Sequence, residues 1–135
     1  MKSRRVSIMI FYDKDKVLIQ DRRKISKYGE EYGFCGGGIE KGETPEQALK
    51  REIKEELSIT LSDFKLFKHD KAIIKDIDME IEYFVSTSKI PDLNSLDVKE
   101  GKMVMFDLNK TLKLKMISED SKILKEFIKL KGEIE

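Results

Sequence analysis

The stretch Gly36-Gly37-Gly38-Ile39-Glu40-Lys41-Gly42-Glu43-Thr44-Pro45-Glu46-Gln47 contains the strongest local signals in the chain. Five of the eight glycines fall between positions 33 and 42. Glycine is used where φ must be positive or where the backbone must approach another group closely. Thr44 suits the N-cap of a helix, Pro45 suits its first position, and Gln47 completes a capping box. The sequence therefore predicts a glycine-rich loop that leads directly into a helix.

Three glutamates gather on one face of this predicted helix, beside an apolar stripe that would pack on a sheet. Glu52, Glu55 and Glu56 stand at i, i+3 and i+4, so their Cβ atoms lie about 5–6 Å apart. Two like charges 4 Å apart repel by roughly 4 kcal/mol at an effective dielectric near 20. Carboxylate and backbone carbonyl oxygens are the ligands that Mg²⁺ prefers. The pattern favours metal-assisted attack on a phosphoanhydride, with an ordinary solvated acidic face as the alternative.

From Gly37 to Ile59 the sequence resembles the Nudix box, which reads Gly, five residues, Glu, seven residues, Arg-Glu-aliphatic-any-Glu-Glu-any-Gly-aliphatic. The matching residues are Gly37, Glu43, Arg51, Glu52, Ile53, Glu55, Glu56 and Ile59. The one departure is Ser58, where the family has a glycine that ends the helix with positive φ. The resemblance implies one Nudix domain over residues 1–135, an α/β/α sandwich with a mixed β-sheet and the box (37–59) as loop-helix-loop.

The resemblance also implies a hydrolase that cleaves a phosphoanhydride bond in a nucleoside diphosphate linked to another group. Its cofactor would be Mg²⁺ or Mn²⁺. The implied protein ligands are the Gly37 carbonyl, Glu52, Glu55 and Glu56. By the same resemblance, Glu43 and Arg51 pair and hold the loop against the helix. Water attacks a phosphorus of the diphosphate bridge in such enzymes, and Glu52 is also a candidate base.

The loops before and after the helix contribute further candidates. Gly36 and Gly37 present accessible backbone that would contact the substrate. Some relatives place another glutamate in a loop before a late strand, and Glu100 lies where that loop is expected. Glu100 is therefore either an additional metal ligand or base, or a plain loop residue.

Candidate substrate contacts also lie outside the box. In mutator-type Nudix pyrophosphohydrolases an arginine near the end of the second strand contacts the phosphates, and Arg22 aligns best with it. The alternative for Arg22 is an exposed residue at a strand end. Tyr32 and Phe34 flank the glycine loop and either stack on a base or pack in the core. Asp120 either reads a base edge from the start of the last helix or complements the dipole of that helix.

Apolar and alternating runs predict strands over residues 6–12, 17–22, 32–35, 63–74, 79–88 and 102–108. The first two strands are expected to form a hairpin across the turn at 13–16. Residues 91–100 are interpreted as a loop and 109–116 are ambiguous. A last helix begins at Ser118. Strands interleaved with two helices indicate a single α/β domain.

Composition excludes several classes of protein. The 135 residues include 27 Lys and Arg against 26 Asp and Glu, a net charge of +1, which argues against a nucleic-acid polymer as partner. The apolar runs are too short for a transmembrane helix, so no membrane is expected. The lone cysteine, Cys35, excludes an internal disulfide, is interpreted as a buried thiol and favours a cytoplasmic setting. Many Nudix proteins form homodimers, but no segment here indicates one.

The expected partner is a small nucleotide, most simply a (deoxy)nucleoside triphosphate cleaved to the monophosphate and pyrophosphate. Residues 75–77 lack the proline typical of ADP-ribose hydrolases. A nucleoside diphosphate sugar or ADP-ribose remains the rival substrate class. A Nudix module that senses nucleotides without cleaving them is the third reading, although every box carboxylate is present. The base contact expected from the last helix is not visible, so the sequence does not support oxidised-guanine specificity.

Overall fold

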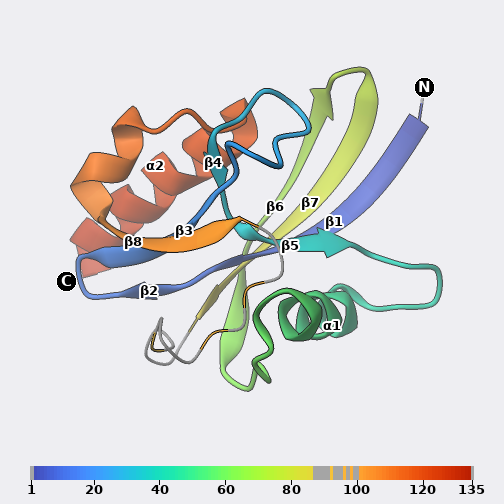
Figure 1. Ribbon diagram of the computed structural model, residues 1–135, viewed down its shortest axis with the longest axis horizontal. Coiled ribbons are helices and arrows are strands. Elements are labelled where there is room, and N and C mark those ends of the chain that lie inside the picture. The colour runs from blue at the N-terminus through green and yellow to red at the C-terminus, as the bar shows by residue number, and fades with distance from the viewer. Residues whose placement is uncertain (1, 87–91, 93–95, 97, 99–100, 135) are drawn as a thin grey trace.

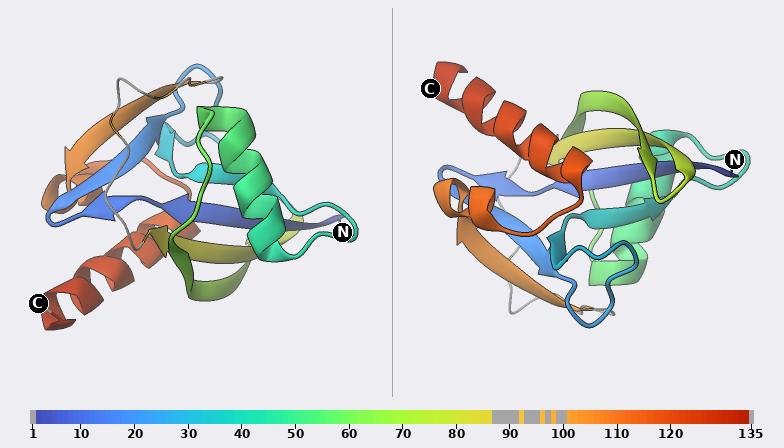
Figure 2. Two further views of the ribbon diagram at one scale, coloured as in Figure 1. Left: turned by 90° about the horizontal axis from the view of Figure 1, so that it is seen from below. Right: turned by 90° about the horizontal axis from the view of Figure 1, so that it is seen from above.

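The computed structural model describes these residues of the chain: 2–86, 92, 96, 98 and 101–134. They form two four-stranded β-sheets. One helix lies on either side of the strands, as Figures 1 and 2 show. The elements in chain order are β1 (Lys2–Ile10), β2 (Tyr12–Asp13), β3 (Lys16–Asp21), β4 (Tyr32–Gly33), β5 (Cys35–Gly38), α1 (Pro45–Leu57), β6 (Phe64–Ile74), β7 (Ile77–Ser86), β8 (Lys102–Asp107), a 3₁₀ turn (Leu108–Lys113) and α2 (Ser118–Ile134). The predicted α/β/α class is confirmed.

Helix α1 begins where the sequence predicts. The Thr44 hydroxyl accepts a hydrogen bond from the Gln47 amide at 3.1 Å, and the Gln47 side chain accepts one from the Thr44 amide at 2.9 Å. This reciprocal pair is a complete capping box. At the other end Ser58 has φ 60° and ψ 31°, the left-handed conformation that glycine adopts most easily. The helix therefore ends as it would with glycine, at a cost of about 1 kcal/mol for a residue with a side chain.

The first sheet is mixed and has the order β5-β1-β7-β6. Strand β1 pairs in parallel with β7 and antiparallel with β5, and β6 pairs antiparallel with β7. The second sheet is antiparallel, with β3 between β4 and β8 and with β2 also paired to β3. The strands thus form one mixed sheet and one antiparallel sheet. The sequence predicted the mixed sheet but not the second one.

The long hairpin expected from residues 6–12 and 17–22 is wrong in its extent. Only β2 continues into β3 as a hairpin, with Tyr12 opposite Val17 and Asp13 opposite Lys16. Strand β1 ends at Ile10 and belongs to the other sheet. Because Val6 and Met9 lie on opposite faces of β1 and both are buried, this strand needs cover on each side. The first sheet supplies that cover, because Met9 packs with apolar residues of α1 on one face and Val6 packs with apolar residues of α2 on the other.

Two apolar clusters hold the layers together, one under each helix. The cluster under α1 contains Met9, Phe11, Leu18, Cys35, Leu49, Ile53, Leu57, Leu61 and Phe84. The cluster under α2 contains Val6, Ile10, Val17, Ile19, Phe34, Met79, Ile81, Tyr83, Val85, Leu108, Ile123, Leu124 and Phe127. The apolar stripe of α1 is fully buried, which fixes the direction in which its carboxylates point.

Candidate active site

The glycines of β5 let the backbone approach its neighbours too closely for any side chain. A Cβ added at Gly36 would lie 2.1 Å from the Ser7 carbonyl oxygen, and one at Gly37 would lie 2.3 Å from the Glu52 carboxyl carbon. No other residue fits either position without moving the backbone or that carboxylate. The glycine strand therefore allows α1 to place Glu52 directly against the β5 backbone.

Arg51 ties the loop before α1 to the helix. Its Nε and Nη2 donate to the two carboxylate oxygens of Glu43 at 2.8 and 2.9 Å, a bidentate pair. Nη2 also donates to the Gly38 carbonyl at 2.9 Å, and Nη1 donates to Glu52 Oε1 at 2.8 Å. The hydrogen bonds from Arg51 lower the pKa of Glu43 to about 2. The pairing of Glu43 with Arg51 that the resemblance implied is thus present in the structure.

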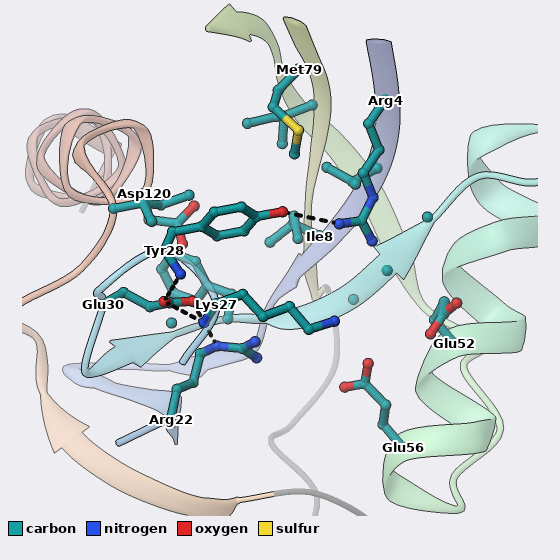
Figure 3. A pocket seen from close by; sticks show the side chains of 18 of the residues that line it. Arg4, Ile8, Arg22, Lys27, Tyr28, Glu30, Glu52, Glu56, Met79 and Asp120 are labelled. Atoms are coloured by element: carbon teal, nitrogen blue, oxygen red, sulfur yellow. Dashed lines mark hydrogen bonds and ion pairs between the residues drawn. The ribbon is translucent and has the colours of Figure 1, made fainter. Parts of the chain in front are cut away.

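The three glutamates of the box differ in their orientation and exposure. Glu52 and Glu56 point from α1 into a pocket, as Figure 3 shows. Glu55 also lines this pocket, but it is largely exposed and lies 3.4 Å from Arg51 Nη1. The three glutamates do not form a group whose oxygens all lie within 4.8 Å of one another. Within the described part of the chain, such a group is formed by His69, Glu80 and Glu82 on β6 and β7.

The residues at the α1 end of the pocket nevertheless fit a divalent cation. Glu52 and Glu56 face the same space from successive turns of the helix. The absence of a side chain at Gly37 keeps the Glu52 carboxyl against the β5 backbone, where a Cβ would displace it. Carboxylate and carbonyl oxygens are hard donors of the kind that Mg²⁺ and Mn²⁺ take.

The pocket has a volume of about 450 Å³ and runs from α1 to the start of α2. Figure 3 shows three zones along it. Carboxylates of α1 lie at one end. Arg4 and Lys27 reach over the β5 glycines in the middle. The other end is bounded by Tyr28, Met79 and Asp120.

Asp120 is buried at the end of the pocket that is far from α1. It accepts a hydrogen bond from the hydroxyl of Tyr83 at 2.7 Å, and its side chain is among those that line the pocket. Burial raises the pKa of Asp120 to about 6, although the Tyr83 hydrogen bond works in the opposite direction. A carboxyl group with this pKa populates both protonation states near neutral pH.

Arg22 lines the pocket, but neighbours hold its guanidinium. Nε donates to Glu30 Oε2 at 3.1 Å and Nη1 donates to the Gln20 side-chain oxygen. Glu30 is itself buried. The structure therefore brings Arg22 to the pocket wall in a neutralised ion pair.

Of the two aromatic candidates, Phe34 lines the pocket and Tyr32 does not. Phe34 is buried in the core and also lines the pocket. Tyr32 does not line it; its ring packs edge-to-face on Phe106 with centroids 5.7 Å apart, and Arg23 lies over the ring. Glu100 lies outside the described residues. Cys35 is buried, and burial raises the pKa of its thiol.

Sequence reasoning missed Arg4, Lys27 and Tyr28, all of which line the pocket. The signal for Arg4 is the strand period: Arg4, Val6 and Ile8 alternate along β1 and therefore share one face. Lys27 and Tyr28 belong to the segment between β3 and β4, where no periodic pattern assigns a direction to a side chain.

Comparison with known proteins agrees with this architecture. A family model described as NUDIX domain matches residues 1–127. An 8-oxo-dGTP diphosphatase of Escherichia coli (strain K12) is 38% identical over 69 residues, which are 50% of this chain and 54% of that protein. An 8-oxo-dGTP diphosphatase of Proteus vulgaris is 33% identical over 87 residues, 64% of this chain and 75% of that protein. The chain thus spans about half the length of the first of these relatives.

Among solved structures, the solution structure of the E. coli ORF135 protein aligns with a TM-score of 0.79 at 23% identity. The alignment covers 97% of this chain and 92% of that chain, and it shows the shared fold. Within the described residues, no helix has the length and apolar character to cross a membrane. On the match of the family model over residues 1–127, the chain belongs to the Nudix family.

Proposed function

We propose that this protein is a metal-dependent Nudix hydrolase that cleaves a (deoxy)nucleoside triphosphate to the monophosphate and pyrophosphate. The observation that carries the proposal is one pocket with Glu52 and Glu56 beside the β5 glycines at one end and Asp120 at the other. Such a pocket suits a ligand with a polyphosphate at one end and a base at the other. The two relatives named 8-oxo-dGTP diphosphatase support a nucleoside triphosphate as the substrate class.

The proposed ligands of Mg²⁺ or Mn²⁺ are the Gly37 carbonyl, Glu52, Glu55, Glu56 and Glu100. When bound, the cation would polarise phosphoryl oxygens and offset the charge of the leaving group. Water attacks a phosphorus of the triphosphate chain, a new P–O bond forms, and the anhydride bond between the α and β phosphates breaks, which gives the monophosphate and pyrophosphate. A glutamate takes the proton of that water, and Glu52 is the candidate because Arg51 orients it at 2.8 Å.

The substrate contacts proposed for the rest of the pocket are Phe34, Gly36, Gly37 and Asp120, and Arg22 is left out because Glu30 and Gln20 hold its guanidinium. Because its pKa is about 6, Asp120 can accept or donate a hydrogen bond at a base edge near neutral pH. Its place in the pocket makes oxidised purine nucleotides worth testing, although the sequence alone did not support them. Tyr32 is left out of this set since its ring packs on Phe106.

The test is a hydrolysis assay with Mg²⁺ or Mn²⁺ on nucleoside triphosphates including 8-oxo-dGTP, nucleoside diphosphate sugars, ADP-ribose and dinucleoside polyphosphates. We expect pyrophosphate release from triphosphates, and loss of most of that activity in Glu56→Gln because the proposed metal site loses a carboxylate. Glu46→Gln is the matched control, because Glu46 is an exposed acid of the same helix outside the pocket. Folded wild-type protein that binds nucleotides but releases no phosphate or pyrophosphate from the panel would favour the nucleotide-sensing alternative. Cleavage restricted to sugar nucleotides or ADP-ribose would favour the rival class.

A further inference from the structure

We infer that Lys27 and Arg4, rather than Arg22, supply the cationic contacts to the phosphates of the substrate. The inference rests on the proposed function, since it assigns residues to one part of a nucleotide. Lys27 belongs to the segment between β3 and β4, Arg4 belongs to β1, and both line the middle of the pocket.

The first observation is that Arg22 is already occupied. Its Nε pairs with Glu30 at 3.1 Å, and the side chains of Arg22 and Glu30 are only 19% and 6% exposed. A buried pair of this kind has little net charge to offer a ligand, and breaking it would leave the Glu30 carboxylate uncompensated. Arg22 is therefore a positioning residue for the segment that follows it.

The second observation is that Glu30 fixes the conformation of this segment. Its Oε1 accepts hydrogen bonds from the Ser26 hydroxyl at 2.6 Å and from the amides of Tyr28 and Lys27 at 2.9 and 3.1 Å. Burial works against ionisation of Glu30, but these hydrogen bonds and that of Arg22 prevail and lower its pKa. The backbone that carries Lys27 and Tyr28 is therefore held in place at the pocket.

The third observation is that Lys27 and Arg4 carry uncompensated charge. No carboxylate of the described residues forms an ion pair with either side chain, whereas Arg22, Arg51 and Lys122 all have one. Arg4 Nη1 donates to the hydroxyl of Tyr28 at 3.2 Å, which leaves the charge of the guanidinium unneutralised. In a pocket that is also lined by carboxylates, these two cations without an ion-pair partner in the described part of the chain are the groups suited to bind an anionic part of a ligand.

The two cations lie where the proposed function puts the phosphates, between the carboxylates of α1 and Asp120. Figure 3 shows Lys27 extending from one side of the pocket and Arg4 from the other, and both line the same pocket as Glu52 and Glu56. The Nη2 of Arg4 would be 3.6 Å from a Cβ at Gly38, so the guanidinium lies against the glycine strand. A guanidinium binds phosphate oxygens in bidentate fashion and an ammonium binds them as a point charge. The positive charges of Lys27 and Arg4 would therefore offset the repulsion between the carboxylates of α1 and a bound polyphosphate.

The test compares binding of a nucleoside triphosphate with a non-hydrolysable α,β-methylene bridge and of the corresponding monophosphate, by calorimetry with Mg²⁺. We expect Lys27→Met and Arg4→Gln each to weaken triphosphate binding by about tenfold or more, since each removes charge-assisted hydrogen bonds. Monophosphate binding should fall by less, and added salt should weaken wild-type binding more than that of either variant. Lys24→Met and Arg5→Gln are matched controls because both side chains are exposed and neither lines the pocket.

The variant Arg22→Gln tests whether Arg22 positions the segment that carries Lys27 or contacts the phosphates itself. We expect it to lower the midpoint of thermal unfolding, which Lys27→Met should leave unchanged. The inference is overturned if both Lys27→Met and Arg4→Gln bind the triphosphate as the wild type does. It is equally overturned if Arg22→Gln weakens triphosphate binding selectively at unchanged stability. Wild-type protein that neither binds nor cleaves nucleotides would refute the proposed function itself. If the wild type cleaves nucleotides and both variants bind the triphosphate as tightly as the wild type, only this inference is refuted.

Discussion

Two ion-pair clusters border the pocket. The central residue of one is a cation, and the central residue of the other is a carboxylate. Around α1 a single cation, Arg51, collects the carboxylates of Glu43 and Glu52 and the Gly38 carbonyl. Beyond β3 a single carboxylate, Glu30, collects the guanidinium of Arg22, a hydroxyl and two backbone amides. Each cluster attaches a loop to regular structure.

The difference between the clusters lies in which neighbouring side chains face the pocket. Arg51 is fully engaged, while Glu56 on the same helix still faces the pocket. Arg22 is engaged by Glu30, while Lys27 and Arg4 have no carboxylate partner among the described residues. The central residue of each cluster therefore organises the site, and its neighbours are left to contact the ligand. Substitutions at either centre test this division of roles.

The largest effect is expected at the centre of the α1 cluster. Arg51→Met removes the donors that hold Glu43 and Glu52, so Glu52 loses its orientation against the β5 backbone. We expect hydrolysis to fall by about 10–100-fold, as it does when a residue that orients a metal ligand is removed. Steady-state assays should be run beside Lys54→Met, an exposed lysine of the same helix. Activity within threefold of the wild type would remove Arg51 from the account.

At the centre of the second cluster, Glu30→Gln should act mainly on stability. Glutamine keeps an acceptor for Ser26 but leaves Arg22 without its counter-charge, at a cost of about 2–3 kcal/mol in the free energy of unfolding. Since the folded-state pKa of Glu30 is lowered, its contribution is present above the ordinary value of 4.5 and is lost as the pH falls. Urea unfolding at pH 7 and at pH 3 measures this. A loss of equal size at both pH values would show that the charge is not responsible.

Asp120 borders the same end of the pocket and should respond to pH in the opposite direction. Its folded-state pKa of about 6 lies above the ordinary value of 3.8, so the stability linked to its proton is present below 3.8 and is lost as the pH rises through 6. Asp120→Asn mimics the protonated form and still accepts from Tyr83. We expect it to be more stable than the wild type by about 3 kcal/mol at pH 8, with the difference fading toward pH 4. A variant that is less stable at pH 8 would contradict this.

The smallest effect concerns the end of α1. Ser58→Gly should raise the free energy of unfolding by about 0.5–1 kcal/mol, because glycine adopts a φ of 60° without the strain of a side chain. Hydrolysis should not change, since Ser58 does not line the pocket. Thermal unfolding gives the check, with Ser62→Gly as a control for glycine at an exposed position. An unchanged or lowered stability would mean that the left-handed serine carries no strain.

The α1 cluster was predictable from sequence and the Glu30 cluster was not, for a physical reason. Along a helix, spacing fixes direction, so Glu52, Glu56 and the capping box at Thr44 could be placed before the structure was known. In the segment between β3 and β4 no period exists, and the role of Glu30 depends on contacts that only the folded chain provides. The hairpin expected at β1 failed for a related reason: an apolar strand buried on both faces takes its partner from tertiary packing, here β7.

The central claim is that the carboxylates of α1 hold a divalent cation, and binding of Mn²⁺ followed by electron paramagnetic resonance tests it most directly. We predict saturable Mn²⁺ binding by the wild type, loss of that binding in the Glu52→Gln/Glu56→Gln double variant, and no hydrolysis in excess EDTA. Equal Mn²⁺ binding in the double variant, with loss of the ion only when His69 is replaced, would place the cation at the cluster on β6 and β7 and contradict the account.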